Sequence, residues 1–259
     1  MLRFKQLLCL LCLLPTMLFA QTWQTQSTDT QIAVLELFTA EGCGLCPAAE
    51  RWVTTFPEQG ITDEQLIILG FHIDYLNDKK SWVDRFASPI FSDRQRQLAH
   101  LNLYQSIYTP EFVISGEIIH SWRKYVKEVV MAVNGFTPEA HIALNVTEDQ
   151  NQLNVKTALK IDGIENRQFA VLYLAVTEDG IISKVSGGDN AGTTFHHQHL
   201  VRKWLGPFAL NTKGETDIST EIKLDEDWNR NNLKLVAVVQ NLNDGFVLQG
   251  LSLPLTNKE

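Results

Sequence analysis

The sequence is poor in cysteine and has no excess of positive charge. Four cysteines in 259 residues are too few for a small protein held together by disulfides. Thirty acidic against 22 basic side chains give a formal charge of −8, so no net positive field attracts nucleic acid. With 44% apolar and 20% charged residues, the composition is that of a folded chain rather than a disordered one. We therefore expect an acidic globular protein with no nucleic-acid partner.

The apolar run at the N-terminus is too short to cross a membrane. It covers residues 7–14 and is preceded by Arg3 and Lys5, whereas a spanning helix needs about 20 apolar residues. Ala20 supplies a small residue at a suitable cleavage point. Residues 1–20 are therefore predicted to be a secretory signal peptide. The mature protein would be secreted or periplasmic, with no stable membrane span after cleavage.

Signal cleavage would leave a single cysteine pair, because the other two cysteines lie inside the predicted signal peptide. Cys43 and Cys46 have C-x-x-C spacing. A disulfide across so short a loop contributes little stability through loop-closure entropy. A structural zinc site needs about four ligands, and Pro47 stands where haem attachment needs His. The favoured interpretation is redox chemistry at the pair, with no cofactor beyond its disulfide.

The pair stands between a predicted strand and a predicted helix. Residues 32–38 form a mostly apolar run rich in strand formers. Apolar residues at three- and four-residue steps predict a helix over 48–56, with Pro47 tolerated in its first turn. A helix N-terminus stabilises a thiolate and lowers the pKa of the thiol. We expect Cys43 to be the exposed nucleophile and Cys46 the shielded resolving thiol.

The residues that follow predict further α/β structure. A strand over 66–73 would pair in parallel with the first strand, because a helix connects them. Residues 75–107 are predicted to be a helical insertion. A strand within 108–116, a short return strand at 118–120 and a helix over 122–133 complete the unit.

Several short motifs occur in the order that characterises one secreted family. They occupy residues 35–39, 46–47, 71–75, 86–89, 94–95 and 108–110. Together they closely resemble the domain-of-unknown-function 1223 family, which is itself assigned to the thioredoxin-like superfamily. The resemblance covers about residues 32–133. It implies an α/β thioredoxin-like fold with a redox site over residues 21–137, and it carries no established substrate.

The resemblance also implies roles for residues near the cysteines. The Thr109–Pro110 peptide bond should be cis and face the sulfurs, where the backbone before the proline docks an extended partner peptide. The implied partners are thiol- or disulfide-bearing proteins or small thiols. Leu37 occupies the position of thioredoxin's buried acid. Trp82, Asp84 and Phe86 lie in a segment peculiar to the family and form either a wall over the site or a local core.

Glu36, His72 and Asp74 are candidates for tuning the thiolates or for proton transfer. Glu36 is an acid in an apolar strand, so it is either a proton relay or a hydrogen-bonded structural acid. His72 and Asp74 share one strand face near the carboxyl end, where active sites gather in parallel sheets. They either serve the chemistry or make structural hydrogen bonds.

From residue 138 the apolar residues alternate instead of following helical steps. Short alternating segments separated by Asp, Asn and Gly turns predict an antiparallel β-sandwich domain over 138–259. The irregular stretch 187–207 holds His196, His197 and His199. These imidazoles either bind a transition metal or occupy a solvated or interdomain loop. The loop is the favoured interpretation, and no metal site is predicted. The six predicted strands are 140–147, 153–160, 169–177, 218–224, 233–241 and 246–253.

Taken together, these features favour an exported thiol–disulfide oxidoreductase. The Cys43 thiolate would attack a partner disulfide, and Cys46 would resolve the mixed disulfide. Two other hypotheses stay open. One is a non-catalytic envelope binding or chaperone module with a structural cysteine pair. The other is a metallochaperone that binds copper(I) through both thiolates, with His72 as a further ligand.

Overall fold

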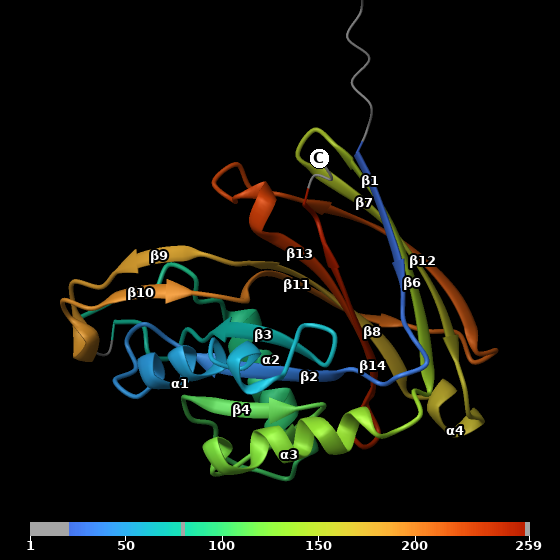
Figure 1. Cartoon of the computed structure of the whole chain (residues 1–259), viewed down its shortest axis with the longest axis horizontal. Coiled ribbons are helices and arrows are strands. Elements are labelled where there is room, and N and C mark those ends of the chain that lie inside the picture. The colour runs from blue at the N-terminus through green and yellow to red at the C-terminus, as the bar shows by residue number, and fades with distance from the viewer. Residues whose placement is uncertain (1–20, 79–80, 257–259) are drawn as a thin grey trace, which may run out of the picture.

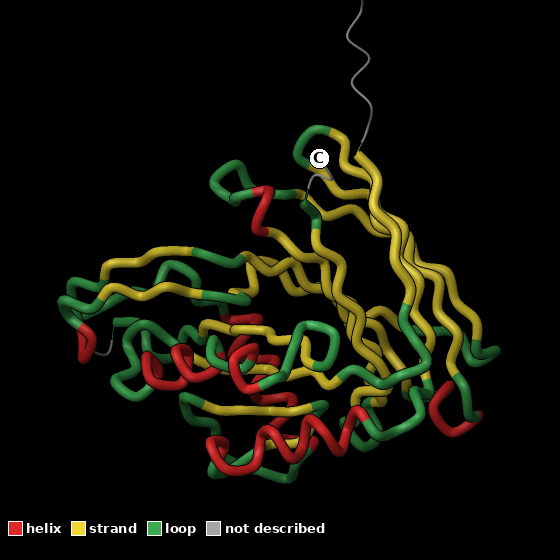
Figure 2. Tube along the Cα trace, viewed as in Figure 1, coloured by secondary structure: helices red, strands yellow, loops and turns green. Residues whose placement is uncertain are grey.

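A computed structural model describes residues 21–78 and 81–256 of the chain (Figure 1). The predicted signal peptide, residues 1–20, lies outside the described residues. Strands dominate the architecture, and the longer helices gather at one end of it (Figure 2). The β-rich character expected for the second half is therefore confirmed. No helix in the described part of the chain has the length and apolar character needed to span a membrane.

An eight-stranded sheet runs through both halves of the chain. Its strand order is β14-β13-β8-β11-β3-β2-β4-β5. β3 pairs in parallel with β2, as predicted, and with β11, whereas the other neighbours are antiparallel. The strands are β2 (Ala33–Thr39), β3 (Leu66–His72), β4 (Glu111–Ile114), β5 (Glu117–Ile118), β8 (Ala170–Glu178), β11 (Leu200–Ala209), β13 (Leu233–Asn241) and β14 (Val247–Pro254).

A second sheet of four antiparallel strands packs against the β8, β13 and β14 part of the first. Its order is β1-β6-β7-β12, and leucine and valine side chains from both sheets fill the space between them. More buried and more exposed positions alternate along these strands, because one face meets the core and the other meets solvent. The strands are β1 (Gln21–Gln26), β6 (Ala140–Asp149), β7 (Gln152–Ile161) and β12 (Glu215–Lys223).

The predicted domain boundary at residues 137/138 is crossed by both sheets. β1, from the first half, pairs with β6 of the second half along its whole length. β11, from the second half, joins the edge of β3, where the amide of Gly70 donates to the carbonyl of His199 at 2.8 Å. Residues 21–137 and 138–259 therefore share their sheets instead of forming separate layers.

The helices lie on the two faces of the β2–β3–β4 region. α1 (Cys46–Val53) and α3 (Trp122–Asn134) share a core with Leu37 and Phe112 on one face. α2 (Pro89–Leu101) packs on the opposite face together with residues of β8 and β13. The β2–β3–β4 region thus lies between α1 and α3 on one face and α2, with residues of β8 and β13, on the other. Short helical turns complete the secondary structure: η1 (Pro57–Gln59), α4 (Ile164–Arg167), η2 (Gly188–Asn190) and η3 (Arg230–Asn232).

The predicted helical insertion over 75–107 is helical only in α2. The described residues between β3 and α2 form turns instead. Polar side chains take the backbone groups that a helix would use: Asn77 Oδ1 accepts from the amide of Asp84 at 3.0 Å, and Asp84 Oδ1 accepts from the amide of Phe86 at 3.0 Å. Asp78 and Ser81 also have positive φ angles, which a right-handed helix excludes.

All six predicted strands of the second half are present, but the stretch 187–207 is not the irregular loop that was expected. β9 (Ile181–Lys184) and β10 (Thr194–His197) form a two-stranded antiparallel arm, with η2 at its tip (Figure 1). β11 begins immediately afterwards. The sequence hid these strands because β10 is short and β11 contains two bulges, one of them at the cis Gly206–Pro207 peptide.

Candidate functional site

The cysteine pair connects the end of β2 to the start of α1. The amide of Cys43 donates to the carbonyl of Ala40, and the amide of Cys46 donates to the carbonyl of Cys43, both at 3.1 Å. These two turns bring the Cα atoms of Cys43 and Cys46 to 5.4 Å, and the two residues form a disulfide. Pro47 occupies the first turn of α1, where its missing N–H costs no helical hydrogen bond.

Neither cysteine is exposed, which corrects the expectation for Cys43. Cys43 is 6% exposed and Cys46 is fully buried, whereas Leu45 between them is 73% exposed. Cys43 packs in a core cluster with Phe38, Ala40 and Ile73. η2, 147 residues further along the chain, also holds the loop: Asn190 Nδ2 donates to the carbonyls of Cys43 at 2.9 Å and Glu41 at 2.7 Å. The position at a helix start predicted an exposed thiol. Contacts with so distant a segment could not be predicted from the residues around Cys43.

The segment before η2 and the turns after β3 meet closely. A Cβ atom built on Gly187 would lie only 2.2 Å from the carbonyl oxygen of Ser81. Only glycine permits this approach. The indole of Trp82, next to Ser81, donates to Glu41 Oε2 at 2.9 Å. Trp82 therefore forms part of the wall beside the cysteine loop, which is one of the two roles expected for its segment.

The Thr109–Pro110 peptide bond is cis, as the resemblance implied. Pro110 is buried and directly precedes β4. β4 runs antiparallel to β2, with Glu111 opposite Phe38, so the cis peptide meets the end of β2. The cysteine loop leaves β2 at that same end. The two features therefore share one edge of the sheet.

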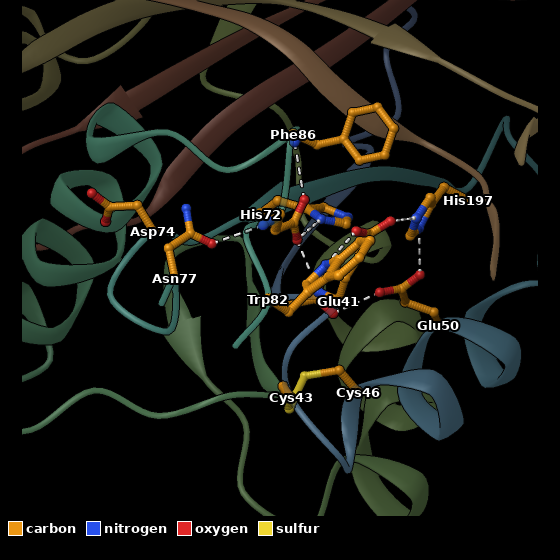
Figure 3. A network of polar contacts seen from close by, with 12 residues as sticks. Glu41, Cys43, Cys46, Glu50, His72, Asp74, Asn77, Trp82, Phe86 and His197 are labelled. Carbon is orange, nitrogen blue, oxygen red and sulfur yellow. Dashed lines mark hydrogen bonds and ion pairs between the residues drawn. A yellow bond between two sulfur atoms is a disulfide. The ribbon is translucent and has the colours of Figure 1, made fainter. Parts of the chain in front are cut away.

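A network of buried acids and imidazoles lies beside the cysteine loop (Figure 3). Its members come from the cysteine loop, α1, the last residue of β3, the turns after β3 and the last residue of β10. Four of them are at most 3% exposed, and Glu50 is partly buried. We call this group the carboxylate–imidazole cluster: Glu41, Glu50, His72, Asp84 and His197.

His197 bridges two carboxylates of the cluster. Its Nδ1 lies 2.8 Å from Glu50 Oε2, and its Nε2 lies 3.2 Å from Glu41 Oε1. Burial lowers the pKa of His197, but the hydrogen bonds to Glu41 and Glu50 outweigh burial and raise the pKa to about 9. Burial raises the pKa of Glu50, yet His197 and the charge of His72 leave that pKa below its ordinary value. Thr39 Oγ1 donates to the second oxygen of Glu50 at 2.7 Å.

His72 is held by Asp84. Its Nδ1 lies 2.7 Å from Asp84 Oδ2, and the same oxygen accepts from the amide of Glu41 at 2.8 Å. Burial raises the pKa of Asp84, but the charge of His72 and its hydrogen bond bring that pKa below the ordinary value. The imidazole rings of His72 and His197 lie 4.8 Å apart, between centroids, at nearly a right angle. The contact joins the two halves of the cluster.

Glu36 and Asp74 lie outside this cluster. Glu36 forms a two-point ion pair with Arg94 of α2, at 2.7 and 2.8 Å, and both side chains are buried. Asp74 accepts from Ser92 Oγ at 2.5 Å, and Figure 3 shows it apart from the cysteines. These contacts match the structural alternatives given for Glu36 and Asp74. His72 is the candidate that the structure brings toward the cysteine loop.

A further buried acid follows the cis proline. Glu111 is 1% exposed, and Glu111 Oε2 accepts from Gln95 Nε2 at 2.8 Å. Burial raises the pKa of Glu111 to about 7, and the hydrogen bond from Gln95 opposes only part of that rise. Glu111 is therefore an acid that titrates near neutrality at the edge occupied by the cysteine loop.

Sequence reasoning did not single out two members of the cluster, Glu41 and Glu50. Glu41 and Glu50 flank the C-x-x-C motif, and Glu50 stands four residues after Cys46, one helical turn along α1. That spacing is the signal that was available. His197 was noticed as part of a histidine group, but His196 beside it is exposed and His199 lies next to Asp179. His196 and His197 are neighbours on β10, so their side chains point to opposite faces of the arm. The sequence did not reveal this, because β10 was recognised as a strand only from its pairing with β9.

The arrangement supports two kinds of chemistry. A disulfide at a helix start, beside a cis peptide, suits thiol–disulfide exchange. Clustered carboxylate and imidazole groups suit proton exchange or cation binding. The two lie side by side, because Glu41 belongs to the cysteine loop and Glu50 to the helix that the loop begins.

Two solved structures share this fold. HBP35 of Porphyromonas gingivalis superposes with a TM-score of 0.70 at 20% identity, over 88% of this chain and 76% of that one. Protein AGR_C_4864 from Agrobacterium tumefaciens gives a TM-score of 0.61 at 16% identity, over 90% of this chain and 98% of that one. No curated protein gives a significant match. The model of the family described as protein of unknown function (DUF1223) matches residues 34–240, so the chain belongs to the DUF1223 family.

Proposed function

We propose that the protein is an exported thiol–disulfide oxidoreductase with a thioredoxin-like redox centre. The observation that carries the proposal is the Cys43–Cys46 disulfide at the start of α1, on the same sheet edge as the cis Thr109–Pro110 peptide. The order β2, α1, β3 with parallel strands supports the thioredoxin-like part of this proposal. The helix N-terminus favours a thiolate after reduction.

The proposed reaction transfers two electrons. The Cys43 thiolate attacks one sulfur of a partner disulfide, forms a mixed disulfide and releases the other partner sulfur as a thiolate. The Cys46 thiolate then attacks the Cys43 sulfur, which re-forms the internal disulfide and releases the second partner thiolate. The partner is reduced and the protein oxidised. The same steps in reverse oxidise a partner dithiol.

Access to Cys43 requires movement of the segments around it. Cys43 is buried in a core cluster, and the side chain of Asn190 is bonded to its carbonyl, so η2 is one of the segments that hold the residue that must meet the partner. Displacing this contact exposes the loop without breaking either main sheet, because β9 and β10 form a separate two-stranded arm. The partner is a protein or small molecule bearing a thiol or disulfide.

A trapping experiment tests the function. Cys46→Ser removes the resolving thiol, so reduced variant mixed with a model disulfide substrate should accumulate a mixed disulfide through Cys43, seen as an added mass that dithiothreitol removes. Cys43→Ser is the matched control and should trap far less. The proposal is overturned if both folded variants, checked by circular dichroism, give no mixed disulfide and the wild type reduces no model disulfide.

Export rests on the predicted signal peptide and has its own measurement. The mature protein isolated from the cell envelope or medium should begin at Gln21, as read from its intact mass. A mass that retains residues 1–20, or recovery only from the cytoplasm, contradicts export and leaves the exchange chemistry to be judged by the trap.

A further inference from the structure

We propose that Glu50, His72 and His197 bind a divalent transition-metal ion, with zinc as the reference ion. One carboxylate oxygen of Glu50 and one nitrogen from each imidazole all lie within 4.8 Å of one another. They come from α1, β3 and β10. Figure 3 shows them in one group with Glu41 and Trp82, near the disulfide. The site contains no sulfur and goes beyond the proposed redox function.

The balance of buried charge favours a cation. Glu41, Glu50 and Asp84 bring three carboxylates to the cluster, against two imidazoles. Lys and Arg residues in the described part of the chain make no ion pair with these acids. Even with both imidazoles protonated, a negative charge is left in a buried place, which is costly. A divalent ion would neutralise that charge.

The hydrogen bonds around the imidazoles are those of metal-binding histidines. Asp84 holds Nδ1 of His72, which leaves its Nε2 for an ion. Glu41 holds Nε2 of His197, which leaves Nδ1 on the side of Glu50. A carboxylate on the far nitrogen fixes the ring and raises its basicity, as in carboxylate–histidine–zinc triads. The ion would take the place of the hydrogen between His197 Nδ1 and Glu50 Oε2, which now lie 2.8 Å apart.

The ligand types select the class of ion. Two imidazoles and one carboxylate suit Zn²⁺, Co²⁺ or Fe²⁺ and leave at least one position for water. Metal–ligand bonds of about 2.0–2.1 Å place tetrahedral ligand atoms about 3.4 Å apart. The more widely spaced ligand atoms, at most 4.8 Å apart, must therefore move closer together, and His197 Nδ1 and Glu50 Oε2 must open from 2.8 Å. Rotation of the Glu50 side chain and a small shift of the arm can supply both movements.

The test uses the oxidised, full-length mature protein, because its disulfide removes both thiolates as ligands. After treatment with EDTA and dialysis, calorimetric titration with Zn²⁺ should show one ion per chain. Co²⁺ should give a visible ligand-field spectrum without the thiolate-to-cobalt charge-transfer band. A Cys43→Ser/Cys46→Ser double variant should bind Zn²⁺ like the wild type, so the result does not depend on the redox proposal.

Variants assign the ligands. Glu50→Gln and His197→Gln should each weaken Zn²⁺ binding by at least about 100-fold, beyond the 10–100-fold typical of outer-shell changes. His196→Gln, on the exposed neighbour of His197, is the matched control and should leave affinity unchanged. Absence of one-to-one binding by oxidised wild type overturns the proposal even if a ligand variant fails to fold. Folded Glu50→Gln and His197→Gln proteins that bind like wild type overturn it as well. Failure of the cysteine trap leaves this result unaffected.

Discussion

Two groups of buried charges involve β2, β3 and the segments around them, and they are balanced in different ways. Glu36 meets Arg94 in a two-point ion pair, and Gln97 and Gln240 accept further hydrogen bonds from the same guanidinium. The carboxylate–imidazole cluster instead gathers more acids than bases. The first group is complete within the chain. The second can still take up or release a cation.

The positions of the two groups match this difference. Glu36 lies in the middle of β2. Its partner Arg94, on α2, packs its guanidinium over the rings of Tyr173 and Trp204. The carboxylate–imidazole cluster lies where β2 and β3 end, beside the disulfide loop. Active sites gather at this end of parallel strands. The contrast teaches that a buried acid marks a functional site when its partners leave charge unbalanced, and that burial alone does not.

The largest effect should come from breaking the balanced pair. Arg94→Met leaves Glu36 buried without its partner and should lower the free energy of unfolding by about 3–5 kcal/mol, measured by urea denaturation. The double variant Glu36→Leu/Arg94→Met should recover most of that loss, because no isolated charge is then buried. A loss below about 1 kcal/mol for Arg94→Met would show that the pair does not carry the structural role assigned to it.

A smaller loss should follow removal of the bridge in the unbalanced cluster. His197→Gln deletes an imidazole between Glu41 and Glu50, and hydrogen bonds to charged groups are worth about 1.5–3 kcal/mol each. We expect a loss of about 2–3 kcal/mol in EDTA, measured by thermal unfolding near neutral pH. His196→Gln should change stability by less than about 0.5 kcal/mol. Equal losses of stability for His197→Gln and His196→Gln would contradict the bridging role assigned to His197.

The smallest effect concerns Glu111, a buried acid with a neutral partner. Its pKa is about 7 in the folded protein, against an ordinary value of 4.5, so the folded state keeps a proton that the unfolded state has lost. The stability from this group is present below pH 4.5 and is lost as the pH rises to about 7. Glu111→Gln should abolish this slope and be more stable than wild type at pH 8. Parallel stability curves from pH 4.5 to 8 would contradict the assignment.

Local sequence patterns predicted much of the fold. The helix from Trp122, the strand pair β2 and β3 and the six later strands follow from apolar periodicity, which depends only on neighbouring residues. The helix predicted before Pro89 failed, because Asn77 and Asp84 bind the backbone with their side chains. The pairings of β1 and β11 were not predicted, because each joins strands far away in the sequence.

The site shows the same limit. The C-x-x-C spacing identified the cysteines, and the resemblance implied the cis peptide. The partner of Glu36 is 58 residues away, and His197 lies 147 residues from Glu50. No period or spacing relates residues at such separations. The burial of Cys43 and its bond from Asn190 were missed for the same reason, since both depend on tertiary contacts.

The reduction potential of the Cys43–Cys46 pair tests the central claim most directly. The purified mature protein is equilibrated with defined dithiothreitol or glutathione redox buffers, and the fraction of disulfide is read by thiol alkylation and mass. A redox-active pair should give a potential between about −270 and −120 mV, the range of known exchange proteins. A potential below about −300 mV would contradict the account, because such a disulfide resists physiological reduction and serves only the structure.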